Sequence, residues 1–444
     1  MGNDLSPTHR NCLGVGEILS KPVAAAPWTQ FTERQRWSFL SILFLVYACN
    51  VFDRNVISVL LEPIKHEFAV SDTLLGFLGG FAFAIFNAVL GIPIARWADR
   101  GDRPKIIALA IGLWSLMTVV CGAAMSFWQL AAARVGVGIG EAGSIPPSQS
   151  LIADYFPPER RTLAFAVFTA AAVVGYLLSF SAGGYLAATL GWRESFLWAG
   201  LPGLALAVAT RLGLGEPRRN LMYATPAQDA EPFGATLKWL LRKRSYVCLA
   251  LGFTLYYFVA YGALVFIPSF AVRVLQQPLS KVSLSYGAVY AAASLLGTLG
   301  GGGMVNRLAR RDSRWLVWAP AIACPLGAPF YIAAFATQDY TTFLAFIFVG
   351  GSILIAGLPP AYAAIQSVCG KPRRAMAVAL ALFAQTFFGG GFGPVVTGAV
   401  SDALQVTHGV DGLRYSLMIM MSILVFAGVA FFYGSRALLA DAEE

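Results

Sequence analysis

The sequence is poor in charge. Of its 444 residues only 12% are Asp, Glu, Lys or Arg, whereas 57% are hydrophobic; a soluble domain carries about 25% charged residues. This scarcity excludes a soluble globular protein, because too few polar side chains remain to cover its surface. The apolar residues form blocks of about 20, the length that an α-helix needs to cross a membrane. Strands of a membrane barrel alternate polar and apolar residues, so we predict an all-α membrane protein.

Histidine and cysteine are scarce as well. The three histidines lie outside the apolar blocks, and the six cysteines form no CxxC pair. We therefore predict no metal, no cofactor and no disulfide framework. A membrane enzyme acting on lipids would need a nucleophile with its base, or a metal site, and the blocks hold no histidine for either. The sequence indicates that the protein is not an enzyme.

Twelve apolar blocks predict twelve transmembrane helices, at 37–65, 73–95, 105–124, 127–152, 162–188, 194–214, 246–270, 283–305, 315–335, 341–367, 375–402 and 415–436. They divide into two halves of six. The predicted domains are an N-terminal tail, a first half, a linker, a second half and a C-terminal tail, at 1–36, 37–214, 215–245, 246–436 and 437–444.

Lys and Arg are distributed unevenly between the two sets of connections. The set that includes both tails and the linker carries 25 of the 32 basic residues, and the opposite set carries five. The positive-inside rule therefore places both termini and the linker in the cytoplasm. This bias accounts for the net charge of +9 without a nucleic-acid partner. The linker segment FGATLKWLLRKRS is basic and amphipathic, which predicts a helix lying against anionic membrane lipid.

The two halves resemble each other. The segment IPPSQSLIADYFPPERR, which begins at Ile145, is matched by LPPAYAAIQSVCGKPRR, which begins 213 residues later at Leu358. The paired prolines and the basic doublets keep the same spacing in both. Parallel repeats of this kind place a substrate site between the halves, near the middle of the membrane.

Four charged residues lie more than one turn from the ends of the predicted helices: Asp53, Arg54, Arg134 and Glu141. Each costs about 2.5–3.5 kcal/mol at the centre of a bilayer unless it meets water or an opposite charge. Asp53 and Arg54 are adjacent, so they point about 100° apart and cannot pair well. Arg134 and Glu141 are separated by about 10 Å along their helix. We therefore predict pairs across helices, Asp53 with Arg134 and Arg54 with Glu141.

Two roles are open for these charges. They could be a clamp that only sets the register of two helices. The repeat argues against this role, because the positions equivalent to Arg134 and Glu141 are Ile347 and Leu354. Charges confined to one half favour proton handling by Asp53 and Glu141 and binding of an anionic headgroup by Arg54 and Arg134.

Further candidates lie elsewhere. Asp99, Arg100 and Arg103, at the cytoplasmic end of the second helix, predict a gating latch between helices; simple solvation of a loop is the alternative. Tyr257 and Tyr261 lie in an aromatic stretch of the seventh helix and are candidates to line a site for an acyl chain. Packing against lipid or neighbouring helices is the alternative for the two tyrosines.

Several motifs resemble a known family. ARWADRGDRPK, from Ala95 to Lys105, resembles the signature loop of the major facilitator superfamily, although Ala95 and Asp102 replace two of its glycines. NVFDR, ARVGVGIGEAG and GWRESF resemble the Spinster branch, whose animal members export sphingosine-1-phosphate and lysophospholipids. The segment GIGEAG also fits the dinucleotide fingerprint GxGxxG, but that fingerprint needs a strand and a βαβ unit around it.

The resemblance implies a twelve-helix transporter of the bacterial inner membrane. We predict proton-coupled transport of an amphiphilic, lipid-like solute by alternating access. A drug/proton antiporter is the first alternative, although Ser179 to Gly184 departs from the Gly-Pro-x-x-Gly-Gly that such antiporters usually carry. A lipid sensor that transports nothing is the second alternative.

Overall fold

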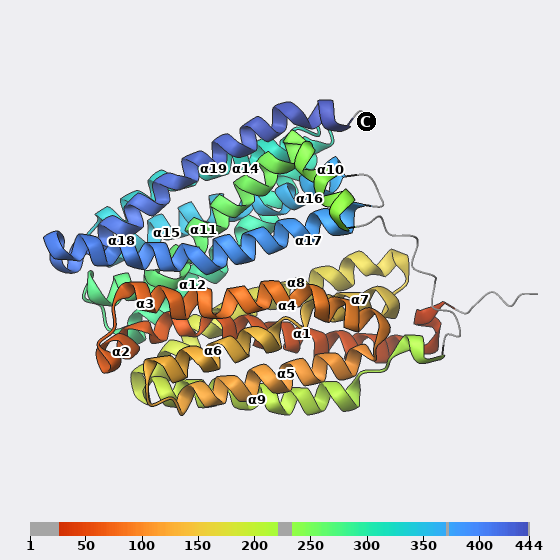
Figure 1. Cartoon of the computed structure of the whole chain (residues 1–444), viewed down its shortest axis with the longest axis horizontal. Coiled ribbons are helices and arrows are strands. Elements are labelled where there is room, and N and C mark those ends of the chain that lie inside the picture. The colour runs from red at the N-terminus through yellow and green to blue at the C-terminus, as the bar shows by residue number, and fades with distance from the viewer. Residues whose placement is uncertain (1–25, 221–232, 370–372, 443–444) are drawn as a thin grey trace, which may run out of the picture.

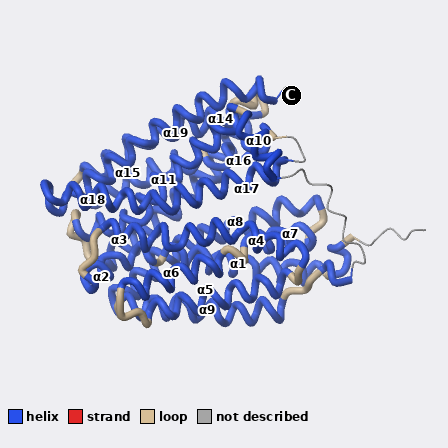
Figure 2. The backbone as a smooth tube through the Cα atoms, viewed as in Figure 1, coloured by secondary structure: helices blue, strands red, loops and turns tan. Residues whose placement is uncertain are grey.

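A computed structural model describes residues 26–220, 233–369 and 373–442 of the chain, and within these ranges all regular structure is helical. Figures 1 and 2 show two bundles of long helices lying side by side. The six passages of the first half are α1 (Glu33–Asn55) with α2 (Ile57–Phe68); α3 (Asp72–Gly76), η2 (Phe77–Phe81) and α4 (Ala82–Arg100); α5 (Arg103–Gly122); α6 (Phe127–Glu141) with α7 (Ile145–Tyr155); α8 (Pro158–Thr189); and α9 (Trp192–Gly213).

The second half repeats this arrangement. Its passages are α11 (Arg244–Arg273); α12 (Leu279–Leu296), η4 (Gly297–Gly301) and α13 (Gly302–Ala309); α14 (Trp315–Ala336); α15 (Tyr340–Ala356) with α16 (Leu358–Val368); α17 (Arg374–Ala384), η6 (Gln385–Phe392) and α18 (Gly393–His408); and α19 (Gly412–Ala442). The short helices η1 (Pro27–Gln30), η3 (Pro217–Asn220), α10 (Phe233–Arg242) and η7 (Gly409–Asp411) lie outside the passages.

The twelve predicted spans coincide with these twelve passages, so the predicted fold class is confirmed. By length and composition alone, ten stretches of the described residues could each cross a membrane, and one of them, Met376–Ala437, contains two passages. The α6–α7 passage is not among the ten, because a turn at residues 142–144 divides it into two short helices. Its counterpart is divided in the same place: α7 and α16 each begin with the paired prolines and each contain 11 residues.

The two ends of the molecule differ. The end that carries α7, α10 and the C-terminus is here called the linker end, and the end that carries α2, α3 and α18 the far end (Figure 1). At the far end the halves pack backbone against backbone. A Cβ atom on Gly398 of α18 would lie 2.1 Å from the Asp72 carbonyl oxygen, and one on Gly76 2.1 Å from that of Pro394. Only glycine permits this approach.

Charged groups reinforce the contact at the far end. Arg273 of α11 donates to Glu62 of α2 at 2.6 Å and to Asp72 of α3 at 2.7 and 2.9 Å. Asp402 of α18 accepts from the backbone N–H groups of Asp72 and Thr73, each at 2.8 Å, and so caps a helix that belongs to the other half. The far end is therefore closed by bonds between the halves. We call this contact the far-end lock.

Candidate functional site

The predicted pair between Arg54 and Glu141 is present. Arg54 of α1 donates to one carboxylate oxygen of Glu141 on α6 through Nη2 at 2.8 Å and through Nε at 3.0 Å. Asn50, one turn before Arg54, accepts from Nη2 at 3.3 Å and donates to Ser144 at 3.4 Å. Glu141 is fully buried, whereas the Arg54 side chain keeps 22% of its surface exposed. Part of the arginine side chain is therefore accessible to solvent, whereas the carboxylate is not.

The predicted pair between Asp53 and Arg134 is wrong. The Arg134 guanidinium donates to the backbone carbonyls of Asp53 at 3.2 Å and of Arg54 at 3.3 Å. The first passage is interrupted at Val56, between α1 and α2. The carbonyl groups in the last turn of α1 therefore need hydrogen-bond donors from outside the helix. Asn55 contributes to the interruption, because its side chain donates to the Val51 carbonyl at 2.7 Å and competes with the helix for it.

This arrangement leaves the Asp53 carboxylate without the ion pair to Arg134 that the sequence predicted. Asp53 is fully buried, and neither carboxylate oxygen has a hydrogen-bond partner among the described residues. The Phe83 ring of α4 contacts both guanidinium groups, with its centroid 4.9 Å from the Cζ of Arg54 and 5.6 Å from that of Arg134. Such cation–π contacts stabilise the two arginines without neutralising them.

A cavity of about 470 Å³ lies between the halves. Its wall is formed by α8 from the first half and by α11, α12, η4, α15 and α16 from the second. Five of its lining residues are tyrosines, namely Tyr176, Tyr256, Tyr257, Tyr261 and Tyr290. Tyr261 also lines a much smaller cavity of about 20 Å³ next to Arg54 and Phe83. The two tyrosines singled out in the sequence thus lie in the cavity wall, and Tyr261 borders both cavities.

The second half adds a polar chain behind this wall. The Tyr257 hydroxyl lies 3.2 Å from that of Tyr362, which donates to the Gln385 side chain at 3.0 Å. The remaining lining residues are mainly Ala, Leu, Val and Ile. One cavity therefore combines an apolar wall with tyrosine side chains, and it shares Tyr261 with a small cavity that Arg54 lines. This combination suits a molecule with an apolar chain and a polar head.

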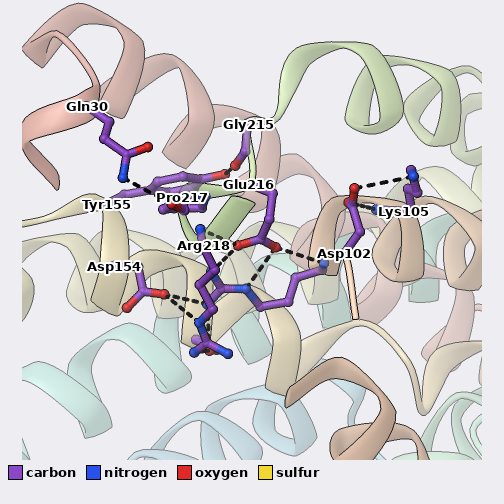
Figure 3. A network of polar contacts seen from close by, with 11 residues as sticks. Gln30, Asp102, Lys105, Asp154, Tyr155, Gly215, Glu216, Pro217 and Arg218 are labelled. Atoms are coloured by element: carbon purple, nitrogen blue, oxygen red, sulfur yellow. Dashed lines mark hydrogen bonds and ion pairs between the residues drawn. The ribbon is translucent and has the colours of Figure 1, made fainter. Parts of the chain in front are cut away.

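Of the predicted gating residues, only Arg103 has a detailed environment. It begins α5, is fully buried, and donates to Asp154 of α7 at 2.7 Å and bidentately to Glu216, which follows α9 (Figure 3). Tyr155 donates to the Gly215 carbonyl at 2.6 Å in the same network. All these partners belong to the first half or to the start of the linker. Within the described part of the chain, these contacts of Arg103 and Tyr155 therefore join helices of one half and the start of the linker.

The other two gating residues are less informative. Arg100 is exposed at the end of α4, and the Asp99 side chain lies outside the part of the chain that the structure describes. Sequence reasoning also missed the roles of Asn50, Phe83 and the far-end lock. A signal for Asn50 was present, because a polar residue one turn before a charged one within a span is unusual. The sequence carries no comparable signal for the far-end lock.

Comparisons with known proteins agree with this architecture. The profile of the Major Facilitator Superfamily matches residues 43–332. A protein of Mycolicibacterium smegmatis, named MFS-type efflux pump, is 36% identical over 91% of this chain and 93% of its own length. The sphingosine-1-phosphate transporter SPNS2 of Xenopus tropicalis is 28% identical over 96% of this chain and 86% of its own length.

A solved structure is similar over nearly its whole length. It is the crystal structure of a bacterial homologue of the human lysosomal transporter Spinster in an inward-facing, unoccupied conformation, with a TM-score of 0.84 and 31% identity, and the similarity covers 93% of this chain and 99% of that one. Two six-helix halves around a shared cavity define a membrane transporter, not an enzyme. The chain belongs to the Major Facilitator Superfamily and is a transporter of the Spinster type.

Proposed function

We propose that the protein moves an amphiphilic, lipid-like solute by alternating access and couples this movement to protons. The observation that carries the proposal is Arg54, which is held by Glu141 at 2.8 Å and lines a small cavity that shares Tyr261 with the wall of the tyrosine-lined cavity. In the empty transporter the carboxylate neutralises the arginine. Protonation of Glu141 removes that charge and frees Arg54 for a phosphate or another anionic headgroup, while the apolar wall holds the chain.

In this mechanism the remaining site residues have separate tasks. Asp53 is the second proton acceptor. Arg134 holds the interrupted end of α1 through its bonds to two carbonyls and adds positive potential beside the headgroup. Tyr257 and Tyr261 contact the solute. Arg103, with Asp99 and Arg100, stabilises the linker end when the cavity opens at the far end.

A drug/proton antiporter is the second candidate, and the name of the Mycolicibacterium relative favours it. The two candidates differ in what Arg54 does. A phosphate bound by Arg54 gains a charge-assisted hydrogen bond worth about 1.5–3 kcal/mol, which is roughly 10- to 100-fold in affinity. A cationic drug gains nothing from it.

Arg54→Ala should therefore discriminate between solutes. In counterflow with purified protein in proteoliposomes, we expect it to weaken binding of sphingosine-1-phosphate and lysophosphatidic acid by about 10- to 100-fold, and that of sphingosine by less than threefold. Arg34→Ala, which removes an exposed arginine in the first turn of α1, outside the cavity, is the matched control. Equal losses for all three solutes would rule out headgroup binding by Arg54. Counterflow of a cationic dye, with none for any of the lipids, would establish the antiporter.

We also propose that the linker end faces the cytoplasm of the bacterial inner membrane. The helix α10 there exposes Phe233 and Leu241 together with Lys238 and Arg242, which suits contact with anionic lipid. On intact cells, an impermeant maleimide should label Met125→Cys and Val406→Cys, both in exposed positions at the far end, and should leave Arg311→Cys at the linker end unmodified. Labelling of Arg311→Cys alone would show that the linker end faces outward, opposite to the proposed orientation.

A further inference from the structure

Several polar side chains of α5 are buried, and no described residue forms a hydrogen bond with them. Trp114 and Thr118 are fully buried, and neither the indole N–H nor the hydroxyl has a hydrogen-bond partner among the described residues. The same holds for both carboxylate oxygens of Asp53 and for Nε of Arg134. A buried polar group without a hydrogen-bond partner destabilises the folded protein. Proteins avoid that cost where space permits by placing ordered water among such groups.

These groups face one another. Trp114, Thr118 and Cys121 are spaced i, i+4 and i+7, so they form one face of α5. The Trp114 indole N–H lies beside the Asp53 carboxylate without meeting the geometry of a hydrogen bond to it, and Cys121 is within electrostatic range of both Asp53 and Arg134. Thr118 lies between these two positions, so it belongs to the same face. Ser115, whose hydroxyl is also unpartnered, points instead toward Gly203 of α9.

We propose that ordered water occupies the space between Asp53, Trp114, Thr118 and Arg134, and that Thr118 and Trp114 hold it as the route by which a proton reaches Asp53. The Thr118 hydroxyl accepts a proton from one water molecule as it donates its own to the next, and the Asp53 carboxylate takes up the proton that arrives. No other bond changes. Thr118 and Trp114 are thus positioning residues for proton transfer. This inference rests on the proposed proton coupling and extends it.

The direction of the route follows from α5. The helix runs from Arg103 at the linker end toward the far end, so Thr118 and Cys121 lie on the far-end side of Trp114. The charged and titratable groups that face Asp53 are Glu141 and Arg134 on α6, Cys121 on α5 and Cys49 on its own helix. Glu141, in contrast, pairs with Arg54, which lines the small cavity next to Tyr261. The two carboxylates would therefore receive protons by separate routes, and Asp53 would exchange its proton from the far end while the lock stays closed.

Hydroxyl-radical footprinting of the full-length protein in nanodiscs tests whether ordered water lies beside Asp53. Radicals formed from bound water modify the side chains next to it. Cys121 and Cys324 are matched, because both are buried to at least 99%, one beside Asp53 and one in the second half. We expect Cys121 to be modified well before Cys324, and Thr118→Val to reduce its modification to the Cys324 level. Equal modification of both cysteines in the wild type would overturn the proposal.

A pH jump with an indicator dye tests the route and needs no solute. The component of proton uptake that is missing in Asp53→Asn is the uptake by Asp53 itself. In Thr118→Val this component should be at least about tenfold slower, as expected when a group that transfers protons is lost. Thr118→Ser should restore the rate. Thr210→Val removes another fully buried, unpartnered hydroxyl, on α9, and should leave the rate unchanged.

The outcomes separate this inference from the proposed function. If Asp53→Asn removes a component of uptake whose rate is the same in Thr118→Val and the wild type, the route is wrong and the coupling stands. If Asp53→Asn removes no component, the role of Asp53 in coupling is wrong, and the route falls with it. Trp114→Phe, which retains the ring and lacks the N–H, should slow the same component as Thr118→Val.

Discussion

Proteoliposomes that contain Glu141→Gln or Asp53→Asn are expected to exchange labelled sphingosine-1-phosphate for unlabelled at no less than about a third of the wild-type rate, yet to show no uphill transport in a pH gradient. Exchange moves no net proton, so it requires only the cavity and the opening of each end in turn. Uphill transport requires a carboxylate that alternates between its charged and its neutral form, and the amides remain neutral at every pH.

The expected loss is large because the gradient is the driving force. One proton that crosses about 100 mV contributes about 2.3 kcal/mol, and one pH unit contributes about 1.4 kcal/mol. For a solute without net charge that is moved by one proton, these energies together support accumulation of roughly 500-fold. The two variants should reduce this ratio to about 1. In Glu141→Gln, Arg54 also loses its negative partner, so binding of the phosphate should become independent of pH.

Glu159→Gln is the control for this prediction. Glu159 is an exposed glutamate in the first turn of α8, outside the cavity and the ion pair. Its neutralisation should leave both exchange and accumulation unchanged. If both Asp53→Asn and Glu141→Gln accumulate the lipid like the wild type, the four charges form a clamp between α1 and α6, and the coupling mechanism is wrong.

Gly398→Val is the second change for which we expect a large effect. Its Cβ atom would lie 2.1 Å from the backbone carbonyl oxygen of Asp72 in the other half, and that oxygen cannot move as the end of a flexible side chain can. The overlap is absent once the far end opens. Overpacking of this kind costs about 1–3 kcal/mol or more. The equilibrium between the conformations with a closed and an open far end should therefore shift roughly 10- to 100-fold or more toward the open one.

Distances between spin labels measure this shift. Labels at Met125→Cys and Val406→Cys place one probe on each half at the far end, both in exposed positions. We expect Gly398→Val to convert the distribution to a longer distance. Arg273→Ala should act in the same direction, because it leaves Glu62 and Asp72 buried without their guanidinium. Gly302→Val adds the same side chain where a Cβ atom meets open space, so it should leave the distances unchanged. An unchanged distribution in Gly398→Val would show that the glycine contact does not hold the far end closed.

The local pattern of the sequence determined the membrane class, the twelve passages and the repeat. Each of these depends on a property of neighbouring residues: an apolar block long enough to span a bilayer, or a pair of prolines at which a helix restarts. The pair between Arg54 and Glu141 was also within reach, because charges in the membrane need partners and few were available. The wider site was less accessible from the sequence, since nothing local indicates that Tyr176, Tyr290 and Tyr261 lie around one cavity.

Only the tertiary structure decided which way the charged side chains point. The interruption at Val56 directs Arg134 to backbone carbonyls and leaves Asp53 facing α5, and no sequence spacing encodes that rotation. Arg103 pairs within one half because Glu216, in the segment after α9, and Asp154 of α7 accept from its guanidinium. The far-end lock joins Asp72 and Asp402, which are 330 residues apart. Helix formation is local, whereas the rotation of each helix and its partner in the other half depend on how all twelve helices pack together.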